Sequence, residues 1–170
     1  MFISEKLNDA LNDQITMELA AHVQYLAIAT YFESKTLDRL AAFFYNQAEE
    51  EKMHALKIVH FLAESEADVR FSALEAPRQD FSSPAEAADL FASQEQKVTD
   101  SFYRMQKLAN EEGDFITHNF LQWFVDEQLE EMATANKLRD LIAMAGDNLL
   151  LVEMMVSDLT AAQSASMGAA

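Results

Sequence analysis

Glu51 and His54 lie three residues apart in a stretch, residues 40–64, that otherwise has the pattern of an amphipathic helix. Residues i and i+3 share one face of a helix, so both side chains are expected to point toward its apolar side. A carboxylate and an imidazole on one face make a pair of metal ligands. A single Glu-x-x-His is weak evidence, so the question is what the other helices bring to the same level.

Four long segments and one short one have helical periodicity. We expect helices at about 4–33, 37–65, 84–112 and 114–145, and a short apolar fifth helix at about 147–160. Short links join the first pair and the second pair, whereas residues 66–83 form a long connection without a sustained period. This pattern predicts an all-α protein, a four-helix bundle with one long crossover plus a short fifth C-terminal helix. Residues 1–160 are expected to form one domain, and 161–170 a disordered tail.

Local signals mark the ends of several helices. Ser83, Pro84 and Glu86 have the form of a capping box with proline at the first helical position. Gly113 and Gly146 follow long helical segments, as C-terminal caps do. The fifth segment is apolar nearly all round and too short to cross a bilayer, so we expect it to be buried, with a subunit interface as the place.

The core stripe of each helix follows from steps of four and three residues. The stripes are apolar except near their middles, where every helix places one glutamate: Glu18, Glu51, Glu95 and Glu131. The full set is Leu7, Leu11, Gln14, Glu18, Ala21, Tyr25, Ile28 and Phe32; Leu40, Phe44, Gln47, Glu51, His54, Ile58 and Phe61; Ala88, Phe91, Glu95, Val98, Phe102 and Met105; and Leu121, Phe124, Gln128, Glu131, Ala135, Leu138 and Ile142.

The midpoints of four such helices coincide in a bundle, so these carboxylates are expected to meet in an apolar core with His54 and Gln128. Unpaired ionised groups are very costly there. No Lys or Arg occupies a seam position, so a multivalent cation is the simplest compensation. Carboxylates with one imidazole favour iron or manganese over structural zinc, and because a carboxylate can bridge two ions, four of them can hold a dinuclear site.

Two further groups of residues lie next to this seam. Glu50, Glu127 and Glu130 form either a solvated acidic face or an adjacent third cation site. Tyr25 follows Glu18 by one heptad; such a tyrosine usually fills a core, but its hydroxyl needs a partner when buried, and the site offers one.

Composition excludes several classes of function. The 170 residues carry a formal net charge of −17, with 12 Lys and Arg against 29 Asp and Glu, which makes nucleic acid an unsuitable partner. There is no cysteine, so disulfides and thiolate metal sites are impossible. No segment has the length and apolarity of a membrane span, and the charged start does not resemble a signal peptide, so we expect a cytoplasmic protein without a membrane partner.

Together these motifs resemble those of the bacterial non-haem ferritins over about residues 12–159. ITMELAAHVQY supplies the first glutamate and tyrosine, QAEEEKMHA the Glu-x-x-His, SQEQ the third glutamate, and FLQWFVDEQLEE the Gln and Glu of the fourth helix. The inward-facing carboxylates of ferritin-like bundles are a known arrangement. The resemblance implies an iron-storage ferroxidase that oxidises Fe(II) with O2 or H2O2 and stores a ferric oxyhydroxide mineral in a shell of 24 subunits, with the fifth helix at the four-fold axis.

The resemblance also implies roles for individual residues. One iron would be bound by Glu18, Glu51 and His54, and a second by Glu51, Glu95 and Glu131, with Gln128 close by and Glu51 as the bridge. A third iron site would be formed by Glu50, Glu127, Glu130 and Glu131. Tyr25 and Trp123 match aromatic residues that supply electrons near the centre.

Three alternatives remain open from the sequence. A haem-bearing bacterioferritin would have a second Glu-x-x-His and a haem-ligating methionine, but here the fourth helix reads Gln128-Leu129-Glu130-Glu131 and Met53 is displaced by one position, so no haem is expected. A non-enzymatic helical assembly module would have protonated or misplaced carboxylates. A di-iron or di-manganese oxygenase would need a substrate pocket beside the metals, where Phe44, Phe91 and Phe124 are expected to fill the space.

Overall fold

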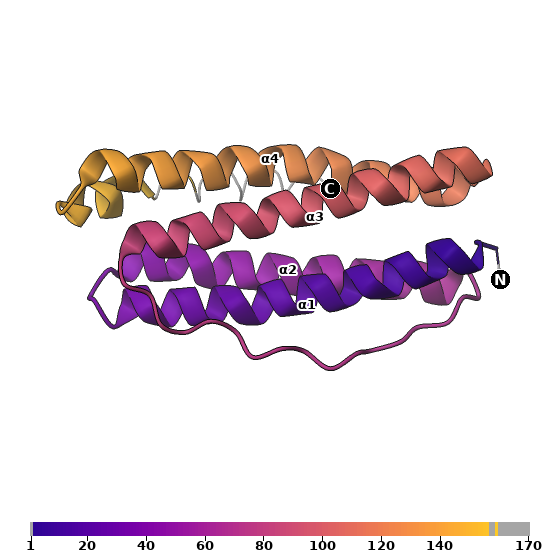
Figure 1. The fold of residues 1–170 in the computed structure, drawn as a ribbon, viewed down its shortest axis with the longest axis horizontal. Helices are drawn as coiled ribbons and strands as arrows, with labels where there is room; N and C mark the ends of the chain where they lie inside the picture. Colours follow the sequence, from indigo (N-terminus) through magenta and orange to yellow (C-terminus); the bar gives the residue numbers. More distant parts are fainter. Residues whose placement is uncertain (1, 157–158, 160–170) are drawn as a thin grey trace.

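The computed structural model describes residues 2–156 and 159, and within them the chain forms helices joined by turns and loops. Four long helices, α1 (Glu5–Glu33), α2 (Asp38–Glu64), α3 (Pro84–Glu112) and α4 (Phe115–Ala145), extend along the length of the molecule (Figure 1). The backbone is helical again over 149–156 and at 159. The predicted all-α bundle is confirmed, and each long helix begins and ends within one residue of its expected bounds.

The connections between the helices explain the directions in which they run. Short turns join α1 to α2 and α3 to α4, whereas residues 65–83 run along the outside of α1 and α2 (Figure 1). This crossover returns the chain to the end where α2 began, so α2 and α3 point the same way. The predicted single crossover is confirmed.

Two buried amides fix the crossover on α1. The Asn12 Nδ2 donates to the carbonyl of Asp68 at 2.8 Å, while its Oδ1 accepts from the backbone N–H of Arg70 at 2.6 Å. The Gln24 Nε2 donates to the carbonyl of Arg78 at 2.7 Å, and its Oε1 accepts from the N–H of the same residue at 2.8 Å. Each amide thus replaces the backbone hydrogen bonds that an irregular segment cannot form with itself.

The ends of α3 follow the sequence signals, with one difference. Ser83 Oγ accepts from the N–H of Glu86 at 3.2 Å, and Pro84 occupies the first turn as expected. The Glu86 carboxylate, however, accepts from the N–H and Oγ of Ser82 at 2.7 Å, one residue before the N-cap, so the reciprocal half of the box is shifted. At the other end Gly113 takes φ 70°, the left-handed conformation that glycine adopts without strain.

The segment 149–156 packs against the bundle of its own chain. Val152 and Val156 are buried in the apolar core at one end of the bundle, together with Leu159. The Glu153 carboxylate accepts from the backbone N–H groups of Arg39 at 2.9 Å and Leu40 at 3.0 Å. It caps the N-terminus of α2, whose own N-cap, Leu37, has no side-chain hydrogen bond.

The opposite face of that segment is exposed at Leu150, Leu151, Met154 and Met155. The expected burial is therefore confirmed for one face, while a subunit interface for the other stays a prediction. The predicted tail, 161–170, lies outside the described residues. Among the described residues, no helix combines the length and apolarity that a membrane span requires.

The core consists of two apolar clusters, one toward each end of the bundle. One cluster includes Phe32, Phe44 and Phe91; the other includes Leu11, Phe102 and Phe124. The four seam glutamates belong to neither cluster, and they occupy the middle of their helices between the two. Rigid apolar packing on both sides therefore fixes the level at which the carboxylates meet.

Candidate metal centre

The seam predicted from periodicity is the buried interior of the bundle. Every residue of the four stripes is buried except Phe61, which is half-buried and stacks on Phe120 with ring centroids 3.8 Å apart. The four glutamate side chains are almost inaccessible, and exposure reaches only 6% at Glu131. The helix periods thus bring all four carboxylates into an environment that disfavours unpaired charge.

Glu18, Glu51 and His54 form the tightest group of ligand atoms among the described residues. One ligand atom from each lies within 4.8 Å of the other two, and all three residues are buried. The His54 Nδ1 and a Glu51 oxygen are 3.3 Å apart. The helical spacing of α2 supplies two members and the facing position of α1 supplies the third, so the structure brings the predicted Glu-x-x-His pair together with Glu18, and their role as ligands stays a prediction.

Glu95 lies opposite this group and is occupied by hydrogen bonds. The Tyr25 hydroxyl donates to one of its oxygens, and the Gln128 Nε2 donates to the other at 3.2 Å. Thr99 Oγ1 donates to the Glu95 carbonyl at 2.8 Å and accepts from Gln128 at 3.1 Å. The α3–α4 side is therefore a hydrogen-bonded network in which Glu95 is the acceptor.

Two buried carboxylate oxygens, one of Glu18 and one of Glu131, have no hydrogen-bond partner. Burial, together with the charge of Glu51, raises the pKa of Glu18 well above its usual range. Burial and the charge of Glu95 do the same to the pKa of Glu131. Protons or cations must therefore neutralise these groups.

The chemistry of this donor set fits a hard, multivalent cation. Its members are carboxylate oxygens and one imidazole, without thiolate, and no Lys or Arg lies among the seam residues. A hard cation prefers oxygen ligands, and this site offers carboxylate oxygens without hydrogen-bond partners next to three converging side chains. Both iron and manganese satisfy these preferences.

Comparison with known proteins distinguishes between iron and manganese. A model of the ferritin-like domain matches residues 8–145. A ferritin BfrB of Mycobacterium tuberculosis (strain Erdman) is 40% identical over 152 residues, 89% of this chain and 84% of that protein. The chain belongs to the ferritin family. Ferritins are iron-storage proteins, so iron is the cation that this protein stores.

Other relatives agree with this assignment. A bacterial non-haem ferritin of Staphylococcus aureus (strain MRSA252) is 38% identical over 146 residues, 86% of this chain and 88% of that protein. Among solved structures, an open-pore ferritin from the archaeon Archaeoglobus fulgidus superimposes with a TM-score of 0.87 at 35% identity, covering 92% of this chain and 97% of the other. The ferritin-like fold is thereby confirmed.

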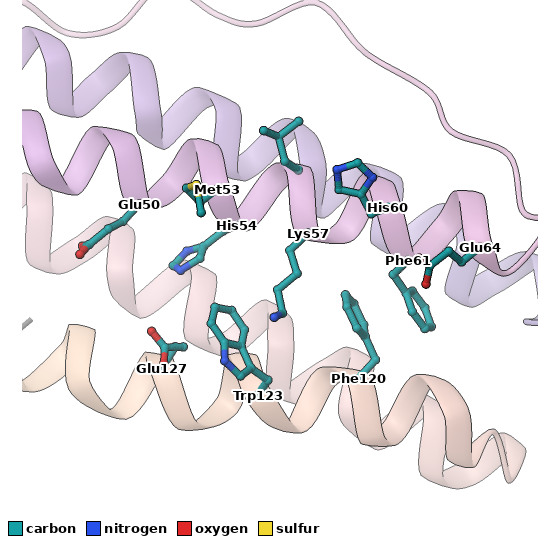
Figure 2. A pocket seen from close by; sticks show the side chains of 11 residues that line it. Glu50, Met53, His54, Lys57, His60, Phe61, Glu64, Phe120, Trp123 and Glu127 are labelled. Carbon is teal, nitrogen blue, oxygen red and sulfur yellow. The ribbon is translucent and has the colours of Figure 1, made fainter. Parts of the chain in front are cut away.

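The three acidic residues predicted beside the seam are not equivalent in this ferritin. Glu50 and Glu127 line a pocket between α2 and α4, with a volume of about 710 Å³, and His54 lies at its inner wall (Figure 2). Glu130 is exposed and does not line this pocket. The structure thus brings two of the three residues to one opening of the seam, and a third iron site stays a prediction.

The two aromatic residues named from the sequence contact the seam from different sides. Tyr25 is fully buried, donates to Glu95, and packs edge-on to Phe91 with ring centroids 5.1 Å apart. Trp123 packs edge-on to His54 with centroids 5.6 Å apart. The predicted partner for the Tyr25 hydroxyl is therefore present, and it is a seam carboxylate.

Sequence reasoning assigned no role to three residues that orient the carboxylates, although it placed two of them, Gln14 and Gln47, on the core stripes. The Gln14 Nε2 donates to Glu18 at 2.9 Å, Gln47 donates to Glu50, and Thr99 joins Gln128 to Glu95. Gln14 and Gln47 were recognisable in principle, because each is a polar residue on an apolar stripe one turn before a seam glutamate. Thr99 lies beside the stripe of α3, and no spacing rule indicates it.

Proposed function

We propose that this ferritin oxidises Fe(II) at a dinuclear ferroxidase centre within each subunit and stores the product as a ferric oxyhydroxide mineral. The observation that carries the proposal is the convergence of Glu18, Glu51 and His54 in a core without a basic residue to neutralise them. Glu51 is the member of this triad whose pKa is raised by burial and by the charge of Glu95. This electrostatic link to Glu95 suits a ligand shared by two ions.

Each group has a distinct part in the proposed reaction. Glu18, Glu51 and His54 would bind one ferrous ion, and Glu51, Glu95 and Glu131 a second, with Gln128 beside it. Two ferrous ions supply two electrons, enough to reduce one O2 to H2O2, or one H2O2 to two waters. The anionic oxygens favour the ferric product because hard anionic ligands stabilise the higher charge. Reduction of O2 beyond H2O2 to water takes two more electrons; Tyr25 would supply one, with its hydroxyl proton passing to Glu95, and a ferrous ion at the predicted third site would supply the other.

The aromatic packing beside the carboxylates supports a small oxidant over an organic substrate. Phe44, Phe91 and Phe124 are fully buried next to the seam. Phe44 and Phe91 contact each other edge-on at 5.2 Å, and Phe124 stacks on Phe102 at 4.5 Å. These rings fill the space on their own sides of the seam, which favours a small oxidant there, whereas the pocket lined by Glu50, His54 and Glu127 is open beside the carboxylates.

Storage requires a closed container, which we propose is a shell of 24 identical subunits. The family assignment supports it, as does the exposed apolar face of the segment 149–156, which suits a contact between copies. Light scattering on the purified protein measures the assembly; a mass of about 24 chains is expected.

The test of the ferroxidase centre is the initial rate of ferric absorbance after about two ferrous ions per subunit are added to metal-free protein in air. We expect fast oxidation in the wild type and only the slow rate of buffer in Glu51→Ala. Glu49→Ala is the matched control, because Glu49 is an exposed neighbour on the same helix that pairs with Lys52. Equal rates in wild type and Glu51→Ala would refute the proposal.

A further inference from the structure

Lys57 is a basic residue in a mainly apolar pocket that also carries three glutamates and two histidines. It lies on α2 one turn after His54, and its half-buried side chain extends toward α4 (Figure 2). Among the eleven residues that line the pocket between α2 and α4, three are glutamates, Glu50, Glu64 and Glu127, and Lys57 is the one Lys or Arg. Because the protein stores a cation, a positive side chain at this position would repel the ion that it stores.

An aromatic platform holds the Lys57 ammonium in place. Its Nζ lies 3.9 Å from the centroid of the Trp123 ring, within the range of a cation–π contact. Trp123 is itself fixed edge-on between His54 and the Phe124 ring, whose centroid is 4.8 Å away. The charge is therefore positioned by the same residues that form the inner wall of the pocket.

The Lys57 charge acts on Glu127, one of the carboxylates that a third ion would use. Burial raises the pKa of Glu127, and the charges of His54 and Lys57 oppose that rise. Glu50 and Glu127 also repel each other, as do Glu127 and Glu130. A cation arriving at Glu50 and Glu127 would gain from these glutamates but would be repelled by the ammonium over Trp123.

We propose that Lys57 is an electrostatic gate that limits cation binding at the mouth of the pocket, beside Glu50 and Glu127. With its charge fixed over Trp123, it lowers the affinity of a third ion there while leaving the buried triad to fill first. The inference rests on the proposed function for the identity of the cargo, but it concerns ion binding and does not depend on oxidation.

The test is an anaerobic calorimetric titration of metal-free protein with ferrous ion, comparing Lys57→Met with the wild type. Methionine keeps a long apolar stem against Trp123 and removes the charge. We expect a third ion to bind about tenfold more tightly in Lys57→Met, the size of a unit-charge effect in a partly exposed site. Lys57→Arg keeps the charge over the ring and is expected to match the wild type.

Lys52→Met is the matched control for net charge. Lys52 lies on the same helix, outside the pocket, and pairs with Glu49. The proposal is overturned if Lys57→Met binds ions as the wild type does, or if Lys52→Met changes the third ion equally. Lys57→Gln provides a second charge-free variant, and far-ultraviolet circular dichroism checks the fold of each.

The two proposals fail in different ways. If Glu51→Ala does not slow oxidation, the ferroxidase proposal fails, while the titrations still report whether Lys57 controls the third ion. If the third-ion affinity is unchanged in Lys57→Met, the gate is absent, and the result for Glu51 stands unaffected.

Discussion

The two sides of the seam contain similar residues, but they differ in how far their side chains are already arranged to bind an ion. On the α1–α2 side, Glu18, Glu51 and His54 converge within 4.8 Å, and one Glu18 oxygen has no hydrogen-bond partner. On the α3–α4 side, one Glu131 oxygen likewise has no hydrogen-bond partner, but both oxygens of Glu95 accept hydrogen bonds, from Tyr25 and Gln128. The α1–α2 side therefore resembles a preformed ion site. On the α3–α4 side, an ion that binds Glu95 must replace existing hydrogen bonds.

In the proposed dinuclear centre, this difference would give the two ions an order of binding. The triad already converges, and an ion there replaces only the 3.3 Å contact between His54 and Glu51, whereas binding at Glu95 must disturb the hydrogen bonds from Tyr25 and Gln128 that stabilise its charge. We therefore expect the first ion at Glu18, Glu51 and His54, and the second at Glu95 and Glu131. In the proposed centre Glu51 would be shared by both ions, which would make it the residue through which the first ion positions a ligand for the second.

The largest effect should come from removing one ligand from each side. Glu18→Ala is expected to weaken the first ion by about a hundredfold or more, since loss of supporting residues alone costs 10–100-fold. Because the second ion relies on a Glu51 positioned by the first, Glu18→Ala should weaken it too. Glu131→Ala should leave the first ion bound and weaken the second. Anaerobic ferrous titration measures both.

Equal losses of both ions in the two variants would show that the sides fill together. In that case the hydrogen bonds of Glu95 would have no bearing on the order. An exposed carboxylate in the crossover, Glu75, supplies a control for charge through Glu75→Ala, which should leave both ions unchanged.

A smaller effect, on the stability of the protein, is expected when one hydrogen bond to Glu95 is removed. Tyr25→Phe removes a buried donor to Glu95, and the loss of a hydrogen bond to a charged group costs about 1.5–3 kcal/mol of stability. Urea unfolding of the metal-free protein measures this loss. Tyr45→Phe removes an exposed hydroxyl that donates to Glu33, and its expected cost is much smaller. Equal losses of stability in Tyr25→Phe and Tyr45→Phe would mean that the buried hydrogen bond to Glu95 contributes no more than an exposed one.

Periodicity was sufficient for the position of the seam, because burial in a bundle depends on which helix face a residue occupies. Glu18, Glu51, Glu95 and Glu131 therefore met as predicted, and only Phe61, near the end of its stripe, is less buried than expected. The hydrogen bonds and the convergence of side chains on each side of the seam were not predictable from the sequence, since they depend on side-chain rotamers. No spacing rule reveals that Tyr25 and Gln128 both donate to Glu95.

Contacts between distant segments were also beyond the sequence. Asn12 and Gln24 bind a crossover more than fifty residues away, and Glu153 caps a helix that begins more than a hundred residues earlier. The sequence shows a polar residue on a helix in each case. The partner depends on how the crossover and the C-terminal segment lie on the bundle, which only the tertiary structure fixes.

The finest test of the comparison uses two glutamines, one from each side. Gln14 donates to Glu18 at 2.9 Å, and Gln128 donates to Glu95 at 3.2 Å, so each amide orients one carboxylate. Residues that orient metal ligands affect affinity by 10–100-fold, and because each glutamate keeps other ligands beside it, we expect about tenfold. Gln14→Leu should weaken the first ion, and Gln128→Leu only the second. If Gln128→Leu weakens the first ion as strongly as Gln14→Leu does, then the two sides act as one network, and the preorganised triad is not an independent first site.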